Sequence, residues 1–124
     1  MSMEADLSTL LKTVCPRVFP DVAPSGTAKP FMTWQGLGGE SLRFVDNTAP
    51  DKRNTYMQVS AYSTTRAEAL ALIRAAEAAL CASPAFVCKP QGEPISTYEE
   101  DTKLYGAIQR HSIWAARSEE HTSE

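Results

Sequence analysis

The sequence predicts an α+β fold in which two helices pack on a largely antiparallel sheet of about four to five strands, in the order α-β-β-α-β-β. Three observations predict it: a short amphipathic run near the N-terminus, a long helical run in the middle of the chain, and alternating apolar segments on both sides of that run. A chain of 124 residues fits one domain with its own core. We expect that domain to span residues 1–117 and residues 118–124 to form a disordered tail.

The first helix is predicted over residues 3–14, because apolar side chains recur there every three or four positions and Pro16 follows. The connection from Pro16 to Pro30 contains four prolines and is expected to be extended and to cross the surface. A first strand then follows in PFMTWQ, residues 30–35.

Three glycines, at positions 36, 38 and 39, follow this strand. A phosphate-binding loop needs glycines at set intervals together with a helix N-terminus or a lysine, and this segment has neither. The glycines therefore favour a sharp bend or a bulge at the end of the strand. Residues 41–45 are compatible with resumed strand pairing, and residues 46–54 are predicted to form an exposed, mobile loop.

The central strand and helix give the strongest local signals. Residues 55–62 alternate as a strand, with a predicted core face made by Thr55, Met57, Val59 and Ala61. A helix is predicted from about residue 65 to 82, because Thr65 and Glu68 form a capping-box pattern and Pro84 follows the run. Its tightest apolar arc consists of Ala69, Leu72, Ile73, Ala76, Ala79 and Leu80.

The C-terminal part of the chain is predicted to add two strands. Residues 85–89 form the first, and residues 90–102, with two prolines and an acidic tip, are expected to be a long turn. The last strand runs from Leu104 to Ala116, with Ala107, Ile113 and Ala115 on one face.

Composition and charge exclude several classes of function. The net charge is −3 and the 12 basic residues are scattered, which argues against sequence-specific nucleic-acid binding. No apolar run is long enough to cross a membrane, and the acidic N-terminus argues against secretion. The three cysteines are widely spaced and odd in number, so reduced, partly buried thiols are expected.

No residue pattern predicts catalysis, a cofactor or a metal. The only histidines are His111, expected within a strand, and His121, in the expected tail. Cys81 lies at a helix C-terminus, where the helix dipole opposes thiolate formation. The acidic residues 99–101 lack the further spaced oxygen ligands of a calcium loop and are expected to be a solvated turn. We therefore predict that the protein is not an enzyme and has no cofactor.

Three runs of the sequence resemble a family of small tailed-bacteriophage and prophage proteins. The runs are RVFPDVAPSGTAKPFMTWQ, RNTYMQVSAYSTTRAEALALIRAAEAAL and TYEEDTKLYGAIQRHSIW, and the resemblance covers roughly residues 3–116. The family is that of the tail-completion or tail-terminator proteins, which act in head-tail joining and are often catalogued as a domain of unknown function. None of the matching segments is a catalytic motif, and the loop from Gly36 to Asn54 and the charged tail depart from the pattern.

The resemblance implies a ring, often of six copies, at the head-proximal end of the tail. Such a ring caps the tail tube and offers the surface that joins the tail to the head. The implied partners are further copies of the chain, the tail tube protein and the head-tail connector protein. The implied location is the virion tail, reached from the host cytoplasm during assembly.

The segment from Gly36 to Asn54 is the predicted partner-binding loop, because it combines flexible glycines with exposed apolar and basic side chains. Its candidate binding residues are Leu37, Arg43, Phe44, Lys52 and Arg53. A loop without a partner is the alternative. For the whole chain, the alternative function is a small α+β binding module for nucleic acid or a small ligand, because fold alone does not decide function.

Overall fold

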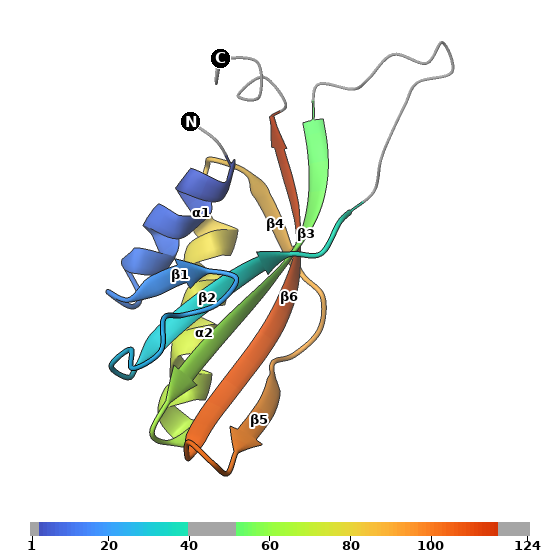
Figure 1. Cartoon of the computed structure of the whole chain (residues 1–124). Coiled ribbons are helices and arrows are strands. Elements are labelled where there is room, and N and C mark those ends of the chain that lie inside the picture. Colours follow the sequence, from blue (N-terminus) through green and yellow to red (C-terminus); the bar gives the residue numbers. More distant parts are fainter. Residues whose placement is uncertain (1–2, 40–51, 117–124) are drawn as a thin grey trace.

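The computed structural model describes residues 3–39 and 52–116 of the chain and has an α+β fold (Figure 1). In chain order, its elements are α1 (Met3–Lys12), β1 (Val18–Pro20), β2 (Phe31–Gly36), β3 (Lys52–Ser63), α2 (Arg66–Ala82), β4 (Val87–Pro90), β5 (Ile95–Glu99) and β6 (Leu104–Ala116). The predicted fold class is confirmed. The sheet has six strands rather than four to five, and the element order is α-β-β-β-α-β-β-β rather than α-β-β-α-β-β, because the sequence pattern does not predict β1 and β5.

The sheet is built around β3 and β6, which pair antiparallel along their whole lengths, from Lys52 opposite Ala116 to Ser63 opposite Tyr105. The strand order is β1-β2-β3-β6-β4, and β5 also pairs with β6. All pairings are antiparallel except that of β1 with β2. The longest strand predicted from sequence, residues 104–116, is therefore confirmed and lies at the centre of the sheet.

The strands β4 and β5 lie one after the other along the same edge of β6. β5 pairs with residues 104–108 and β4 with residues 111–114. Between them the Gln91 N–H donates to the Arg110 carbonyl at 2.8 Å, and the Gln109 side chain donates to the Gly92 carbonyl at 2.9 Å. The prediction that residues 90–102 form only a long turn is thus wrong. The sequence pattern does not predict β5, because all five of its side chains are exposed and it therefore lacks an alternation of apolar and polar residues.

The three residues of β1 pair in parallel with Met32 to Trp34 of β2. The Asp21 N–H extends this contact by donating to the Trp34 carbonyl at 2.8 Å. Such a short strand has no periodic signal in the sequence. The connection that follows it, residues 21–29, leads into β2 and becomes important for the surface described below.

Both helices cover the same face of the sheet, and α2 runs behind β2 and β3 in the view of Figure 1. The Thr65 hydroxyl accepts the Glu68 N–H at 3.1 Å, which confirms the predicted helix start. The Glu68 carboxylate accepts instead from the Ser63 hydroxyl, so the capping box is completed on one side only.

The core fills the space between the helices and this face of the sheet. Its fully buried side chains from the helices include Leu7, Leu11, Ile73 and Leu80. They meet Met32 from β2 and the predicted face of β3, where Met57, Val59 and Ala61 are completely buried. Burial of this apolar area is the main stabilising contribution to the fold. No helix of the described chain is long and apolar enough to span a membrane.

The predicted bulge at the end of β2 is confirmed. The Leu37 N–H donates to the Tyr56 carbonyl and the Tyr56 N–H donates to the Gly38 carbonyl, both at 2.7 Å, so two residues oppose one. Gly38 has φ of +89° and Gly39 has φ of +152°. A Cβ atom on Gly39 would overlap the carbonyl of Asn54 and lie 2.9 Å from the Thr55 Cα, so only glycine fits there.

The predicted mobile loop is wrong for residues 52–54, which form the start of β3. These residues are polar, and polarity is the reason that the sequence pattern assigns them to the loop, but their backbones pair with β6 and Asn54 is buried. The predictions for residues 41–45 and 46–51, and for the tail 118–124, concern segments outside the described residues.

Candidate interaction surface

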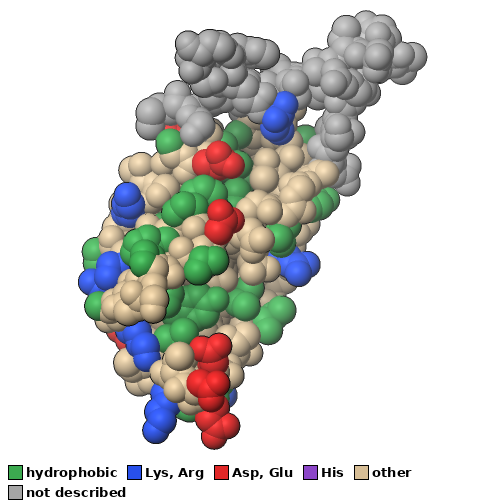
Figure 2. Space-filling model, viewed as in Figure 1, with side chains coloured by type: hydrophobic (Ala, Val, Ile, Leu, Met, Phe, Trp, Pro, Cys, Tyr) green, Lys and Arg blue, Asp and Glu red, His purple; other side chains and the backbone are tan. Residues whose placement is uncertain are grey.

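The face of the sheet turned away from the helices is not covered by a helix in the described structure. The strand registers place Phe31 opposite Tyr62, Thr33 opposite Ser60 and Gln58 opposite Arg110 on this open face. The Phe31 and Tyr62 rings are in contact, with centroids 5.1 Å apart. Figure 2 shows hydrophobic side chains gathered over the middle of this face. An exposed apolar patch of this kind is typical of a binding surface.

A hollow of about 800 Å³ opens on this face, and we call it the open-face hollow. Three segments form it: the connection after β1, the sheet itself, and the end of the β5–β6 hairpin. The complete lining is Asp21, Val22, Ala23, Pro24, Gly26, Thr27, Lys29, Phe31, Thr33, Tyr62, Thr97, Tyr98, Glu99, Thr102 and Leu104. At one end the Lys29 ammonium donates to the Thr102 carbonyl at 3.2 Å, which ties two of the walls together.

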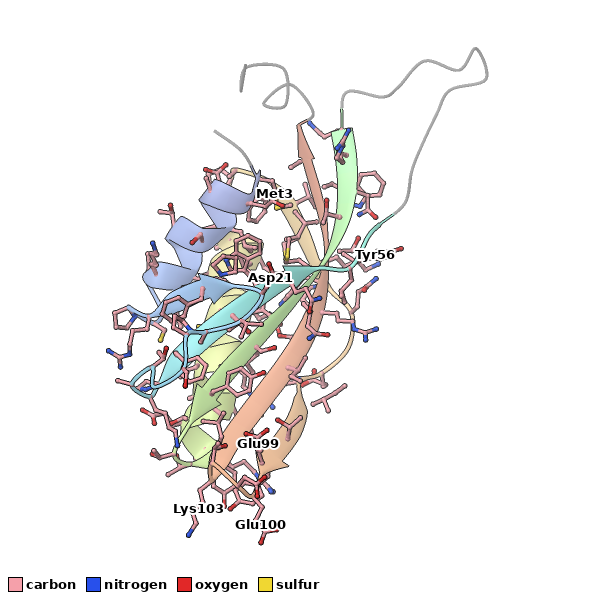
Figure 3. All side chains as sticks on the ribbon, in the orientation of Figure 1. Met3, Asp21, Tyr56, Glu99, Glu100 and Lys103 are labelled. Atoms are coloured by element: carbon pink, nitrogen blue, oxygen red, sulfur yellow. The ribbon has the colours of Figure 1, made fainter. Side chains whose placement is uncertain are left out.

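The hollow combines an aromatic floor with an apolar and acidic rim. Val22 is 79% exposed and Tyr98 is 47% exposed, and both line the hollow. In Figure 3 the carboxylates of Asp21 and Glu99 lie near the middle and at the tip of the face, and both residues also belong to the lining. Large apolar side chains left in water favour burial against a partner. The hollow is therefore a candidate docking surface.

The predicted partner-binding residues do not lie in the hollow. Leu37 is 38% exposed at the bulge after β2, and Lys52 and Arg53 are exposed at the start of β3. Arg43 and Phe44 lie outside the described residues. The hollow is at the far end of β3, beside Tyr62. The molecule thus presents two different surfaces near opposite ends of its central strands.

Sequence reasoning missed the hollow because no single segment carries its signal. The lining comes from residues 21–33, from Tyr62 and from residues 97–104. Only the strand pairings bring them together, and the sequence pattern does not predict two of the strands involved. The prolines between residues 16 and 30 indicate a surface connection, which is correct, but not which face it crosses.

A second polar cluster lies on the helix side, where α2 packs on β4 and β6. The Cys88 sulfur is 3.4 Å from Nδ1 of the fully buried His111. Burial, together with the nearby Cys81, raises the pKa of Cys88 to about 12. Burial lowers the pKa of His111, and the Glu77 carboxylate only partly opposes this shift. Both groups are therefore neutral at pH 7, unlike the thiolate and imidazolium of a catalytic pair.

The surroundings of this cluster are also structural. The Gln109 amide donates to the Glu77 carboxylate at 2.8 Å and so links β6 to α2. His111 is a sheet residue, as predicted. Of the expected reduced thiols, Cys15 is buried, Cys88 is half-buried and Cys81 is exposed. Within residues 3–39 and 52–116, no three His, Cys, Asp or Glu side chains are grouped to hold a metal ion.

The comparison with protein families gives a match that covers the whole described fold. The family model described as "Tail completion protein gp17" matches residues 2–116. The matched range begins before α1 and ends with the last residue of β6. The comparison with curated proteins found no match.

Proposed function

The chain belongs to the tail completion protein gp17 family of phage tail proteins, and on this premise we propose that it caps the tail tube and helps join the tail to the head. The observation that carries the proposal is the family match over residues 2–116, which includes both helices and all six strands. In this role the protein occupies the end of the tube as a ring, with six copies as the family resemblance implies. Its partners are other copies of the chain, the tail tube protein and the head-tail connector protein.

The distribution of surfaces supports a ring. A closed ring needs heterologous contacts, in which one surface of a subunit meets a different surface of the next. The open-face hollow lies beside Tyr62, whereas Leu37 and Lys52 are exposed near the other end of β3. Two unlike surfaces on one subunit are what such a contact requires.

The chemistry of the described residues supports a structural role over an enzymatic one. Cys88 and His111 form a close pair of potentially reactive groups, and burial holds both of them neutral. A protein that ends tube growth acts through binding free energy and shape, so it needs no reactive group. Assembly then takes place in the host cytoplasm and the product resides in the virion tail.

Removing the protein from particle assembly tests this function. We expect a phage or prophage that lacks the gene to yield heads and tails that remain separate, and expression of the intact chain to restore joined particles. A variant lacking residues 42–49 should fold, because β2 ends at Gly36 and β3 begins at Lys52, but should restore joining poorly. Normal infectious particles in the absence of the gene would contradict the proposal.

The hollow also favours a second candidate, a module that binds a small ligand. Its volume of about 800 Å³ lies within the range of small-molecule pockets. Nucleic acid fits this surface less well, because Asp21 and Glu99 line it and repel phosphate. A small molecule that co-purifies with the protein would favour this second function. Retention on nucleic acid at physiological salt would instead favour a nucleic-acid-binding module.

A further inference from the structure

We propose that Cys81 and Cys88 form a redox site that is oxidised by a low-molecular-weight disulfide such as oxidised glutathione. Cys81 first takes up one half of the small molecule, and Cys88 then displaces it to close a disulfide bond with Cys81. The site lies where the C-terminal end of α2 packs against the strand β4. The inference goes beyond the proposed function and does not depend on it.

A short connection brings the two cysteines together. α2 ends one residue after Cys81 and β4 begins one residue before Cys88, so residues 83–86 are all that separates the two elements. The Ser83 hydroxyl accepts the Ala85 N–H at 3.1 Å, and this hydrogen bond tightens the turn. The chain therefore passes directly from helix to strand, with one thiol on each side of the turn.

The thiol of Cys81 is directed at the residue that carries the second thiol. It donates to the Cys88 carbonyl at 3.6 Å. The two side chains also interact: burial is the main cause of the raised pKa of Cys88, and the charge of Cys81 and a hydrogen bond with its thiol add to it. A disulfide bond needs the sulfurs about 2.05 Å apart, and rotation about the Cα–Cβ bonds can bring neighbouring thiols to this distance.

Cys15 has a separate environment. It is buried, and its sulfur lies 3.7 Å from the Arg17 carbonyl and 3.6 Å from the Pro30 carbonyl. These carbonyls belong to the residues just before β1 and β2, not to α2 or β4. Cys15 is therefore an internal reference for a reaction that concerns the other two thiols.

The exposure of Cys81 makes it the first thiol to react. Its thiolate reaches the small disulfide from solution and attacks one of the two sulfurs. The bond between those sulfurs breaks, and the first glutathione leaves and takes up the proton that Cys81 has lost. The product of this step is a mixed disulfide on Cys81.

The position of Cys88 suits the second step. Cys88 is half-buried, which shields it from molecules in solution, but it lies beside the mixed disulfide and attacks it within one molecule. The second glutathione leaves with the proton of Cys88. Two thiols of the protein are thus oxidised to one disulfide, and one molecule of oxidised glutathione is reduced to two thiols.

The disulfide would join the end of α2 to β4, a four-residue strand that pairs with β6 in the described chain. Such a cross-link stabilises the fold by restricting the unfolded chain. It would stay open in a reducing compartment and close in an oxidising one. We therefore expect the oxidised protein to unfold at a temperature several degrees above that of the reduced protein.

Oxidised glutathione tests the inference on the full-length protein. The reduced chain is incubated with it at millimolar concentration and about pH 8, quenched in acid, and unfolded with N-ethylmaleimide to label the remaining thiols. Mass spectrometry then weighs the tryptic peptides. We expect the peptide of residues 75–103 to have lost two hydrogen atoms and to carry no label, because it contains both Cys81 and Cys88. The peptide of residues 13–17 contains Cys15 and should carry a label.

Two serine variants separate the roles of the thiols. Cys88→Ser lacks the thiol of the second step, so the glutathione adduct on Cys81 should rise at least about tenfold above its wild-type level. Cys81→Ser lacks the exposed thiol, and the half-buried Cys88 should then keep its label. Neither variant should gain thermal stability on oxidation. Circular dichroism checks their folding, and Cys88→Ala replaces Cys88→Ser if serine disturbs the packing beside His111.

Three results on the wild-type chain would overturn the inference, so it stays testable even if a variant does not fold. They are a glutathione adduct that persists on Cys81, a disulfide that includes Cys15, and a peptide of residues 75–103 that still carries two labels. An unchanged unfolding temperature after oxidation would contradict the stabilising effect of the cross-link. None of these results depends on whether particles that lack the gene remain unjoined.

Discussion

The sulfur of Cys88 lies 3.4 Å from Nδ1 of His111, between α2 and the paired strands β4 and β6. This distance resembles that of a nucleophile and its base, yet the surroundings of the pair disfavour the charged forms that catalysis would need. Burial raises the pKa of Cys88 to about 12 and lowers the pKa of His111, so a neutral thiol meets a neutral imidazole. The pair serves packing, in agreement with a structural protein.

Acid should weaken the fold through His111. Its pKa is lower in the folded protein than the value of about 6.5 expected when unfolded, so the unfolded chain binds the proton more readily. The contribution of neutral His111 to the free energy of unfolding is present above about pH 6.5, and it is lost as the pH falls through the lowered folded-state pKa. Urea unfolding at a series of pH values should show this loss. His111→Leu, which cannot titrate, should flatten the curve below pH 6.5; an unchanged slope would refute the assignment to His111.

The cysteines should differ strongly in reactivity. Cys81 is exposed, whereas Cys88 has a raised pKa of about 12 and Cys15 is buried. Because the thiolate is the reacting species, we expect iodoacetamide at pH 8 to modify Cys88 at least about 100-fold more slowly than Cys81. Peptide mapping by mass spectrometry after timed quenching measures both rates. Comparable rates in the folded protein would show that the thiol of Cys88 is not protected.

The contact between α2 and the sheet should dominate stability. Ile73 is fully buried against the core, while its neighbour Leu72 is only half-buried. We expect Ile73→Ala to lower the free energy of unfolding by about 2–5 kcal/mol, because it removes buried methyl groups and leaves a cavity. Leu72→Ala is the control and should cost clearly less. Urea denaturation gives the free energy of unfolding of both variants. Equal losses would mean that α2 turns a different side toward the core.

Two glycines near the bulge should respond differently to alanine. Gly39→Ala combines an unfavourable φ of +152° with overlap of the new Cβ and the Asn54 carbonyl, so we expect a cost of about 1–3 kcal/mol. At Gly36 no atom lies within 4 Å of the position that an alanine Cβ would take, and Gly36→Ala should be tolerated. Thermal unfolding of the two variants provides the comparison. A stable Gly39→Ala variant would mean that the bulge can rearrange.

The elements that the sequence predicts are those in which apolar side chains recur at regular spacing. Residues 104–116 alternate, and residues 65–82 have a cap, an apolar arc and a terminating proline, so the sequence predicts β6 and α2 almost to the residue. β5 exposes every side chain and β1 has three residues, so their pairing depends on backbone hydrogen bonds that leave no pattern in the sequence.

The sites are harder to predict because they depend on register. Cys88 and His111 are brought together by the pairing of β4 with β6 and the packing of α2. The hollow needs Phe31, Tyr62 and Thr97 on one face, which follows only from three strand registers taken together. The family match over residues 2–116 guides the functional interpretation most directly.

Electron cryo-microscopy of purified virions at the junction of head and tail tests the central claim most directly. We predict a closed ring at the head-proximal end of the tube, into whose density the described α+β domain fits copy by copy. If the density at that end is fully explained by other proteins and mass spectrometry finds no trace of this chain in the virions, the claim that it caps the tail is contradicted.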